Sequence, residues 1–432
     1  MSILAAALGL GACAYPYTPP ALSPVTAPAP AATAATEQRS VVTILISIDG
    51  FRPDYLERGV TPALSGLARN GVTGPMLPSF PSKTFPNHWT LVTGLTPDHH
   101  GIVGNNMEDA TRPGEKFTMA TDDPFWWNAA EPIWVTAERA GIRTATMFWP
   151  GANVAWGGTL TKGENHGVPV GGVRPHDWQQ YNIALSGAQR VDAVVDWLRR
   201  PAATRPRLVT LYFDTVDTAG HEHGPDAPET TAAVAEVDGL IARLQRDLAG
   251  LGQPANLVIV ADHGMAATSS TRTIALDRIA DVADYRVLEA GPYGSLYPMP
   301  GREAALARAL TQATPHMTCW PKAAIPARFA YGTNARIPPW LCLAETGWSI
   351  VKTGPTEAFA GGNHGYDNRA PEMRALFVAS GPAFRAGVRL APFPNTDVAP
   401  LLRDLIGLPA GRGLDGDDAP FRRALIRSDE RR

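Results

Sequence analysis

Short apolar runs alternate with helical patterns along this chain of 432 residues. Residues 41–48 are almost continuously apolar and β-branched, which is typical of a strand buried on both faces of a parallel sheet. Similar runs occur at 143–148, 208–213, 257–261 and 375–379. Between two of them, apolar residues recur at helical spacing at Val234, Val237, Ile241, Leu244 and Leu248. Alternating strands and helices predict an α/β fold with a mostly parallel central sheet.

The residues between and after these runs predict where helices, an insertion and the globular body begin and end. Thr61 is expected at the N-cap of a helix, with Pro62 at its first position and Gly71 just past its end. Residues 274–358 are rich in Pro, Trp and Gly, which predicts a small irregular insertion subdomain. Residues 421–432 are expected to form a charged, frayed tail, so the globular body is placed at 40–420.

Composition restricts the classes of function. Hydrophobic residues make up 44% of the chain and charged residues 18%, so the body is globular rather than disordered. The formal net charge is −3 and the sequence has no stripe of Lys and Arg, so stable nucleic-acid binding is not expected. No sequence feature indicates a protein partner.

The first residues predict export. Residues 1–13 are small and apolar and end in Leu-Gly-Ala-Cys, as in a bacterial lipobox with a lipidated Cys13, although the usual basic residues are missing. The Ala, Pro and Thr of residues 14–39 predict a flexible tether to a membrane. These features place the protein in the periplasm or on the outer membrane of a Gram-negative-type bacterium. Cys319 and Cys342 then predict one disulfide, with two free thiols as the alternative.

Acidic and histidine side chains follow several of the predicted strands. The set is Asp49, Asp217, His221, Asp262, His263 and His364. Because ligands gather at the carboxyl ends of strands in open α/β sheets, we expect these side chains to meet at one edge. Carboxylates and imidazoles are the ligands that zinc prefers. The sequence therefore predicts a two-metal site.

Simpler roles stay open for some of these residues. Asp49 is also compatible with an Asx-turn that closes its strand, and His364 with an ordinary position in a glycine-rich loop. His223 competes with His221 as a ligand, and their spacing does not decide between them. The Gly and Pro residues at 217–225 predict a loop or a single turn there, not a long helix.

Thr84 is the candidate nucleophile. It lies between Pro81 and Pro86, ahead of a helix-compatible stretch at 88–92, and a hydroxyl at a helix N-terminus experiences positive potential. A bound metal lowers the pKa of such a hydroxyl further, which makes an alkoxide accessible. Asn105 offers an amide that could hold a phosphoryl oxygen. An ordinary N-cap role is the alternative for Thr84.

Charge arithmetic indicates the type of phosphate ester. Three carboxylates against two divalent cations leave a charge of about +1, and an alkoxide brings it near zero. A phosphodiester then adds one negative charge, whereas a dianionic monoester needs further Lys or Arg. Lys83 and Arg52 are the cationic residues in the segments around Thr84 and Asp49, and the sequence does not show where their side chains point. This favours diesters.

The motifs together resemble one known family. The matching stretches are ISIDGFRPDYL (46–56), PSFPSKTFPNHWTLVTGLTPDHHGIVGNN (78–106), FWPG (148–151), LYFDTVDTAGHEHGP (211–225), VIVADHGM (258–265) and GGNHGYDN (361–368). In this order they resemble the nucleotide pyrophosphatase/phosphodiesterase family of the alkaline phosphatase superfamily. The resemblance implies an alkaline-phosphatase-like α/β/α sandwich, with a catalytic phosphodiesterase domain at 40–420.

The resemblance also implies a role for each site residue. One Zn²⁺ would be held by Asp49, Thr84, Asp262 and His263, and a second Zn²⁺ by Asp217, His221 and His364. Thr84 would form a covalent intermediate, and Asn105 would bind a phosphoryl oxygen. Phe85 and Tyr212 would stack on the base of a small-molecule nucleotide; core packing is the alternative for these two rings.

The implied reaction is hydrolysis of nucleotide phosphodiester and pyrophosphate bonds, with a nucleoside monophosphate as product. A phosphomonoesterase or a phospholipid-directed phosphodiesterase on the same core is the alternative. A non-catalytic surface lipoprotein is disfavoured, because it predicts a missing ligand and the motifs retain the full set. Asn153 replaces an acidic residue that family members often carry after FWPG, and the chain resembles a compact bacterial form.

Overall fold

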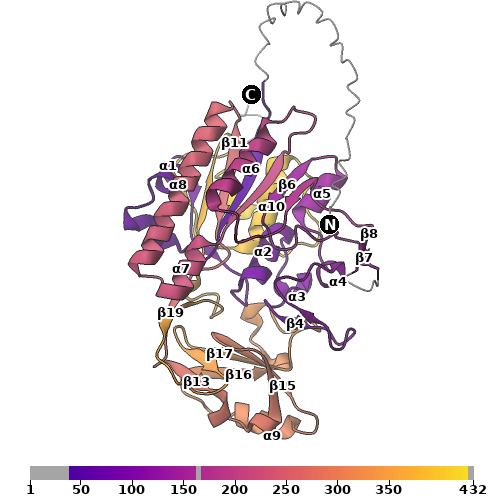
Figure 1. The fold of residues 1–432 in the computed structure, drawn as a ribbon, viewed down its shortest axis with the longest axis vertical. Coiled ribbons are helices and arrows are strands. Elements are labelled where there is room, and N and C mark those ends of the chain that lie inside the picture. The colour runs from indigo at the N-terminus through magenta and orange to yellow at the C-terminus, as the bar shows by residue number, and fades with distance from the viewer. Residues whose placement is uncertain (1–37, 162–166, 427–432) are drawn as a thin grey trace, which may run out of the picture. The chain divides into compact units, whose positions relative to one another are not determined.

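The computed structural model describes residues 38–161 and 167–426, and its described residues from Arg39 onward belong to one compact unit (Figure 1). The predicted lipobox with Cys13 lies outside the described residues, and so does nearly all of the predicted tether. None of the helices in the described part of the chain combines the length and the apolarity needed to cross a membrane.

The central sheet is mostly parallel, as predicted. Its strands follow the order β21-β2-β20-β11-β1-β10-β6-β9. Their bounds are β1 (Val42–Ile48), β2 (Val72–Thr73), β6 (Thr144–Met147), β9 (Asp177–Gln179), β10 (Leu208–Phe213), β11 (Ala255–Val260), β20 (Phe377–Ser380) and β21 (Val388–Arg389). From β11 to β9, all neighbouring strands pair in parallel. All seven residues of β1 are buried, as the apolar run predicted.

One core strand runs against the expected direction. β20 pairs antiparallel with β11 and with β2, although its sequence resembles the parallel strands. A parallel strand needs a crossover connection that spans the sheet, usually a helix. The preceding segment contains only the short 3₁₀ turn η6 (Pro371–Met373). The chain therefore enters β20 from the edge at which His364 lies, and the direction is reversed.

Helices cover both faces of this sheet. α1 (Pro62–Arg69), α6 (Gly187–Arg199) and α8 (Pro228–Gly250) form one layer, in which α8 packs against the other two. On the other face, α2 (Thr84–Thr93), α5 (Ile133–Arg139) and α10 (Val398–Ile406) pack together. Figure 1 shows α6 and α8 in front of the strands and α10 behind them. The result is the α/β/α sandwich that the resemblance implied.

Residues 274–358 are more regular than predicted. They include the antiparallel sheet β14-β15-β17-β16, and a second apolar cluster lies around Leu296 and Leu306. The bounds here are β13 (Thr273–Ala275), β14 (Tyr285–Glu289), β15 (Tyr293–Pro298), α9 (Glu303–Leu310), β16 (Met317–Pro321), β17 (Trp340–Ala344) and β18 (Ser349–Val351). A disulfide joins Cys319 to Cys342 between β16 and β17, which confirms the predicted pairing. A separate subdomain here remains a prediction.

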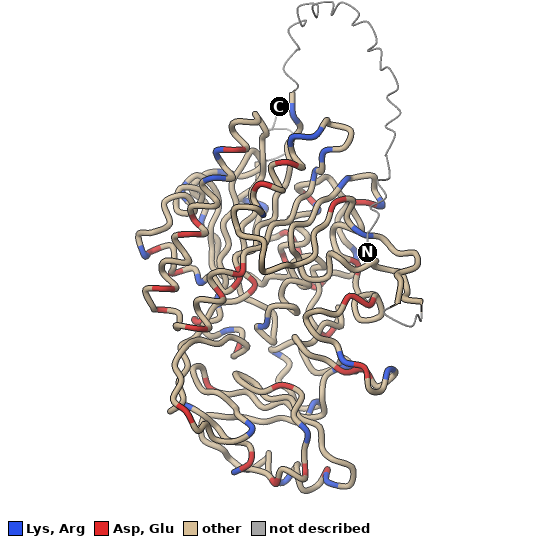
Figure 2. Tube along the Cα trace, viewed as in Figure 1, with Lys and Arg blue, Asp and Glu red and all other residues tan. Residues whose placement is uncertain are grey.

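Smaller elements complete the described chain. The remaining strands and helices are β3 (Met76–Leu77), α3 (Pro97–His100), β4 (Met107–Glu108), β5 (Lys116–Phe117), α4 (Pro124–Trp127), β7 (Thr159–Leu160), β8 (Pro169–Val170), α7 (Thr215–His223), β12 (Ala266–Ser269), β19 (Ala360–Asn363) and β22 (Phe393–Pro394). Figure 2 shows acidic and basic residues interspersed along the described chain.

The C-terminal tail starts later than predicted. Phe421 and Ala424 are fully buried, and the backbone of Ile426 donates a hydrogen bond to Ala383. Burying an aromatic ring anchors this segment, so residues 421–426 belong to the packed body rather than to a frayed tail. Residues 427–432 lie outside the described part of the chain.

A carboxylate from another helix caps α1. Thr61 occupies the predicted N-cap position, but its side chain makes no capping hydrogen bond. The buried Asp238 of α8 instead accepts hydrogen bonds from the backbone N–H groups of Ala63 (3.1 Å) and Leu64 (2.8 Å). The sequence could not show this, because 174 positions separate the carboxylate from Leu64.

We predict that Asp238→Ala lowers the free energy of unfolding by about 2 kcal/mol, because it leaves two N–H groups at the start of α1 without an acceptor. Urea denaturation measures this change. Glu236→Ala removes an exposed carboxylate from the same helix and should stay within about 0.5 kcal/mol of the unmodified protein. Equal effects of the two substitutions would contradict the capping role.

Candidate metal centre and substrate cavity

The carboxyl edge of the parallel strands gathers the predicted acidic residues. Asp49 directly follows β1, Asp262 lies two residues after β11, and Asp217 lies on α7 just after β10. Gly50 adopts a φ of 68°, which turns the chain sharply after the first of them. A Cβ at Gly50 would lie 3.1 Å from Oδ1 of Asp217, so glycine also permits this close approach. The expected convergence at one sheet edge is observed.

The segment around Asp217 is a helix, which corrects the prediction of a loop or single turn. α7 contains nine residues, with Gly220 in its interior. A Cβ at Gly220 would lie 3.0 Å from Cε of Met265, and a Cβ at Gly362 would lie 2.4 Å from the carbonyl oxygen of Gly220. Gly220 therefore allows α7 to pack closely against its neighbours and does not end the helix.

Helical spacing decides between two histidines. Asp217 and His221 lie four residues apart on one face of α7, and His221 Nε2 is 3.4 Å from Asp217 Oδ2. His223 is exposed and lies 3.6 Å from the carboxylate of Glu222 instead. The geometry therefore places His221, rather than His223, beside the acidic cluster.

Asp49, Asp262 and His263 form a fully buried group. Nε2 of His263 lies 2.9 Å from Asp262 Oδ2 and 3.5 Å from Asp49 Oδ1. Oγ1 of Thr84 lies 3.3 Å from the same nitrogen. The candidate nucleophile thus adjoins two carboxylates and an imidazole that come from two different strands.

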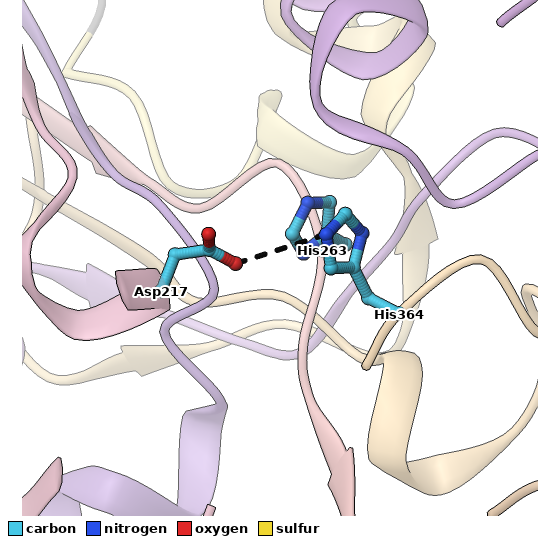
Figure 3. Close-up of side chains that lie close together, drawn as sticks. All are labelled: Asp217, His263 and His364. Atoms are coloured by element: carbon cyan, nitrogen blue, oxygen red, sulfur yellow. Dashed lines mark ion pairs between the residues drawn. The ribbon is translucent and has the colours of Figure 1, made fainter. Parts of the chain in front are cut away.

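His364 joins this group to Asp217. Its Nε2 lies 3.8 Å from Asp217 Oδ1, and Figure 3 shows the carboxylate pointing toward the two rings of His263 and His364. These rings stack with centroids 3.5 Å apart, and the ring of His221 lies 5.0 Å from that of His364. The two halves of the predicted site are therefore continuous.

The three histidines share one hydrogen-bonding pattern. Nδ1 of His221 donates to the carbonyl of Gly362 at 2.9 Å. His263 and His364 donate in the same way to the carbonyls of Gly264 (3.0 Å) and Ser82 (2.9 Å). Each ring therefore turns the lone pair of Nε2 toward the carboxylates. Metal-binding histidines are oriented in this way in proteins.

The carboxylates lack the partners that burial requires. The buried oxygens without a hydrogen bond include Asp49 Oδ1, Asp217 Oδ1 and Asp262 Oδ2. Burial, with added repulsion from neighbouring carboxylates, raises the pKa of Asp49 and of Asp262 well above the usual range.

Burial also lowers the pKa of His263 and of His364, which favours neutral rings. The carboxylates therefore stay ionised at neutral pH only when positive charge lies beside them, and each neutral ring offers the unshared pair of Nε2. Asp217, His263 and His364 offer ligand atoms that all lie within 4.8 Å of one another, and so do Asp49, His88 and Asp262. Apart from His88, whose ring nitrogens are both hydrogen-bonded, these carboxylates and imidazoles fit divalent cations such as zinc.

His88 is a site residue that the sequence analysis missed. Its Nδ1 lies 2.9 Å from the carbonyl of Thr84 and 3.4 Å from Asp262 Oδ2, and its Nε2 lies 2.8 Å from the hydroxyl of Ser47. Burial lowers the pKa of His88 to about 3. Because Nδ1 must donate to the carbonyl, Nε2 accepts from Ser47, and neither nitrogen is free for a metal. The i, i+4 spacing from Thr84 on one helix was the signal available in the sequence.

Thr84 is the first residue of α2, which begins four residues before the helical stretch predicted at 88–92, and Lys83 rather than Thr84 occupies the N-cap position. Asn105 lies next to it, and its Oδ1 accepts a hydrogen bond from the backbone N–H of Phe85 at 3.0 Å. This bond fixes which end of the amide is oxygen and directs its NH₂ group elsewhere. Within the described residues that NH₂ group has no hydrogen-bond partner, so it can donate to a ligand.

Phe85 and Tyr212 line one cavity of about 440 Å³, and Thr84 and Asp49 also line it. Phe85 also packs against Phe117 and Trp127, so it contributes both to the cavity and to the core. The hydroxyl of Tyr212 donates to Asp49 Oδ2 at 2.7 Å. This volume suits a small organic molecule rather than a polymer.

Arg52 and Lys83, the two cationic residues near the predicted site, have different partners. Arg52 forms two hydrogen bonds with Asp54, of 2.9 Å and 2.7 Å. Nζ of Lys83 lies 3.4 Å from Oδ1 of Asn363, the residue before His364, and burial lowers the pKa of Lys83 to about 8. Lys83 therefore adjoins the site, whereas Arg52 is neutralised elsewhere.

The fold and this edge define an alkaline-phosphatase-like α/β enzyme with Asp and His groups that could bind metal. Residues 43–367 match the model of the type I phosphodiesterase / nucleotide pyrophosphatase family. The chain belongs to this family of metal-dependent phosphodiesterases.

Relatives and solved structures agree with this assignment. An uncharacterized pyrophosphatase/phosphodiesterase of Schizosaccharomyces pombe is 39% identical, over 85% of this chain and 77% of its own length. The bis(5′-adenosyl)-triphosphatase of Mus musculus is 36% identical, over 84% and 77%. The structure of human ectonucleotide pyrophosphatase/phosphodiesterase 5 superposes with a TM-score of 0.82 at 33% identity, covering 89% of this chain and all of that one. These relatives are eukaryotic, so a bacterial form stays a prediction.

We predict that His221→Ala loses about one bound metal ion per chain, because it removes one ligand from a small donor set. Metal content after dialysis, measured by atomic emission, checks this. His223→Ala is the matched control, since it removes an exposed imidazole from the same helix and should leave metal content unchanged. Metal loss in the His223 variant alone would show that the wrong histidine has been assigned.

Proposed function

We propose that the chain is a di-zinc phosphodiesterase that hydrolyses nucleotide phosphodiester and pyrophosphate bonds through a covalent phospho-threonine and releases a nucleoside monophosphate. One observation carries this proposal. The hydroxyl of Thr84 lies 3.3 Å from His263 Nε2, at the edge where one oxygen each of Asp49, Asp217 and Asp262 has no hydrogen-bond partner among the described residues. A nucleophile and a cation site therefore share one location.

The donor atoms divide into two sets. Asp49, Thr84, Asp262 and His263 would hold one zinc ion; Asp217, His221 and His364 would hold the other. When bound, such ions lower the pKa of a coordinated hydroxyl and neutralise charge on a phosphoryl group. The paired approach of His263 and His364, whose rings stack 3.5 Å apart, supports two neighbouring ions.

The protein's own residues perform the transfer in two steps. The oxygen of Thr84 attacks phosphorus in line, a bond to phosphorus forms, and the leaving alcohol or nucleotide departs with the electron pair of the broken P–O bond. The free NH₂ group of Asn105 donates to a phosphoryl oxygen whose charge grows during attack. Water then attacks phosphorus, the bond between phosphorus and Oγ1 of Thr84 breaks, and a proton from the water restores the hydroxyl as the nucleoside monophosphate leaves.

The cavity supports a nucleotide as the substrate. Phe85 of α2 and Tyr212 of β10 both line it, and aromatic faces bind any base by stacking. Murine ectonucleotide pyrophosphatase/phosphodiesterase 5, which superposes on this chain with a TM-score of 0.82 at 33% identity, was solved as an inactive threonine-to-alanine variant in complex with AMP. A related fold therefore binds a nucleoside monophosphate, which is the product that we propose here.

The charges near the site support a diester over a monoester. A dianionic substrate would need additional positive charge, and the bonds of Arg52 with Asp54 neutralise that guanidinium. Lys83 remains close to Asn363, at 3.4 Å, and is the single cation of the two that stays beside the site. A phosphomonoesterase is therefore the less favoured alternative.

We also propose that the enzyme is exported and tethered by a lipidated Cys13, in the periplasm or on the outer membrane of a Gram-negative-type bacterium. The disulfide between Cys319 and Cys342 supports an oxidising compartment, because such bonds are rare in the cytosol. Metabolic labelling with a radioactive fatty acid tests the tether, and Cys13→Ser should abolish incorporation.

We predict that Thr84→Ala reduces kcat on an aryl phosphodiester by at least about 10³-fold, because the hydroxyl that attacks phosphorus is missing. Steady-state kinetics and metal analysis on the same preparation check this. Thr84→Ser keeps a hydroxyl and should retain far more activity than Thr84→Ala. Turnover near the unmodified rate in Thr84→Ala, with both metals present, would refute the covalent mechanism.

We predict that Phe85→Leu raises KM for thymidine 5′-p-nitrophenyl phosphate by roughly 5- to 160-fold, because stacking on a base contributes about 1–3 kcal/mol. Leucine retains apolar bulk against Trp127 but lacks a ring face. Methyl p-nitrophenyl phosphate has no base, so its KM should change little. An equal change for both substrates would indicate that Phe85 only supports the core.

A further inference from the structure

A second cavity, of about 840 Å³, lies outside the proposed catalytic site. No residue lines both this cavity and the one at Phe85. Its walls come from the 3₁₀ turn η1 (Pro53–Arg58), α1, the segment after β2, β21 and the turn η6. The charged residues that line it are Arg52, Asp54, Glu57, Arg69, Arg374 and Arg389. The reaction proposed above uses none of these residues.

Positive charge dominates this cavity. Four guanidinium groups face two carboxylates, which leaves a formal charge of +2 on the lining. Asp54 neutralises Arg52 through contacts of 2.9 Å and 2.7 Å. Arg69, Arg374 and Arg389 form no ion pair and no side-chain hydrogen bond with any described residue. Arg69 and Arg389 are exposed and Arg374 is partly buried, so all three guanidinium groups are open to an anion from solution.

Arg374 gives the clearest evidence that the cavity lacks a hydrogen-bond acceptor. Its Nε is buried and has no hydrogen-bond acceptor. A guanidinium nitrogen always carries its proton, so this donor cannot be relieved by deprotonation. Leaving a charged donor buried and unpaired costs more than the net worth of a hydrogen bond. An acceptor from outside the chain would remove this cost.

The remaining lining is apolar and includes Leu56, Ala68, Leu376 and Leu390. Guanidinium groups bind two oxygens of a phosphate group at once, whereas the apolar wall suits a carbon skeleton. The volume lies in the range of sites for small molecules. We propose that this cavity is a second binding site, which takes a phosphate group through Arg69, Arg374 and Arg389. The proposal does not depend on the phosphodiesterase reaction.

A phosphate group reaches such a site from two sources. One source is dissolved phosphate or a small phosphorylated molecule, and the other is the headgroup of an anionic phospholipid. The binding chemistry is the same in both cases, so two arms of one experiment separate them.

The first arm is isothermal titration of the metal-loaded protein with inorganic phosphate at constant ionic strength. Arg389 is exposed, so Arg389→Gln should fold normally; Arg374→Gln removes the buried donor, and its melting temperature serves as the check of folding. Arg308→Gln is the control, because this exposed arginine lies on α9, away from α1 in Figure 1. We expect Arg374→Gln and Arg389→Gln to weaken one class of phosphate sites at least about tenfold, and Arg308→Gln to leave both classes unchanged.

Phosphate can also bind at the catalytic site, and inhibition of turnover reports that site separately. Its competitive Ki should be the same in all three variants. The second arm is sedimentation with phosphatidylglycerol vesicles and, as the control, phosphatidylcholine vesicles. Binding to phosphatidylglycerol that both cavity variants lose would identify the headgroup as the source.

Two outcomes decide between the proposals. If Arg374→Gln and Arg389→Gln bind phosphate and vesicles as the unmodified protein does, this second site does not exist. If the chain shows arginine-dependent phosphate binding but no phosphodiesterase turnover with metal loaded, the proposed function is wrong and the second site stands.

Discussion

The structure depends on bringing carboxylates together where water cannot reach them. Asp49 and Asp262 are fully buried, and each has an oxygen without a hydrogen-bond partner. Burial raises the pKa of both groups, which means that the ionised forms are unstable in the protein alone. Bound cations reverse this effect, because they replace the lost hydration of the carboxylates. Metal binding and the folded state of this sheet edge are therefore coupled.

The path of the chain explains how distant residues meet at that edge. Between His263 and His364 the chain leaves through β12, forms the 274–358 segment and returns through β19. β12 and β19 pair antiparallel, with Ala266 opposite Asn363, so the two histidines become neighbours. A long insertion can be accommodated here because it begins and ends at adjacent strands.

Glycines make the approach of α7 to β19 possible. A Cβ at Gly361 would lie 2.3 Å from the carbonyl oxygen of His221, and one at Gly362 would lie 2.4 Å from that of Gly220. The same contact positions the carbonyl that accepts a hydrogen bond from His221. Close backbone packing thus orients the imidazole toward Asp217. These glycines shape the site through their backbone, although they have no side chain that takes part in a reaction.

The hydrophobic pattern of the sequence alone was enough to predict the central strands and the edge at which the acidic residues lie. The apolar runs at 41–48 and 208–213 became β1 and β10, because a strand covered by helices on both faces has few polar positions. Residues that follow such strands must lie at the carboxyl edge of the sheet, so the positions of Asp49 and Asp262 were also accessible.

Only the tertiary structure decided the remaining features, because they depend on contacts between segments that are far apart in the sequence. The direction of β20 follows from where the chain leaves the site, and α7 packs closely against Met265 and Gly362 at Gly220. The cap of α1 comes from Asp238 on another helix. Local sequence fixes which side chains are available, whereas packing over long separations fixes their orientation and the choice between His221 and His223.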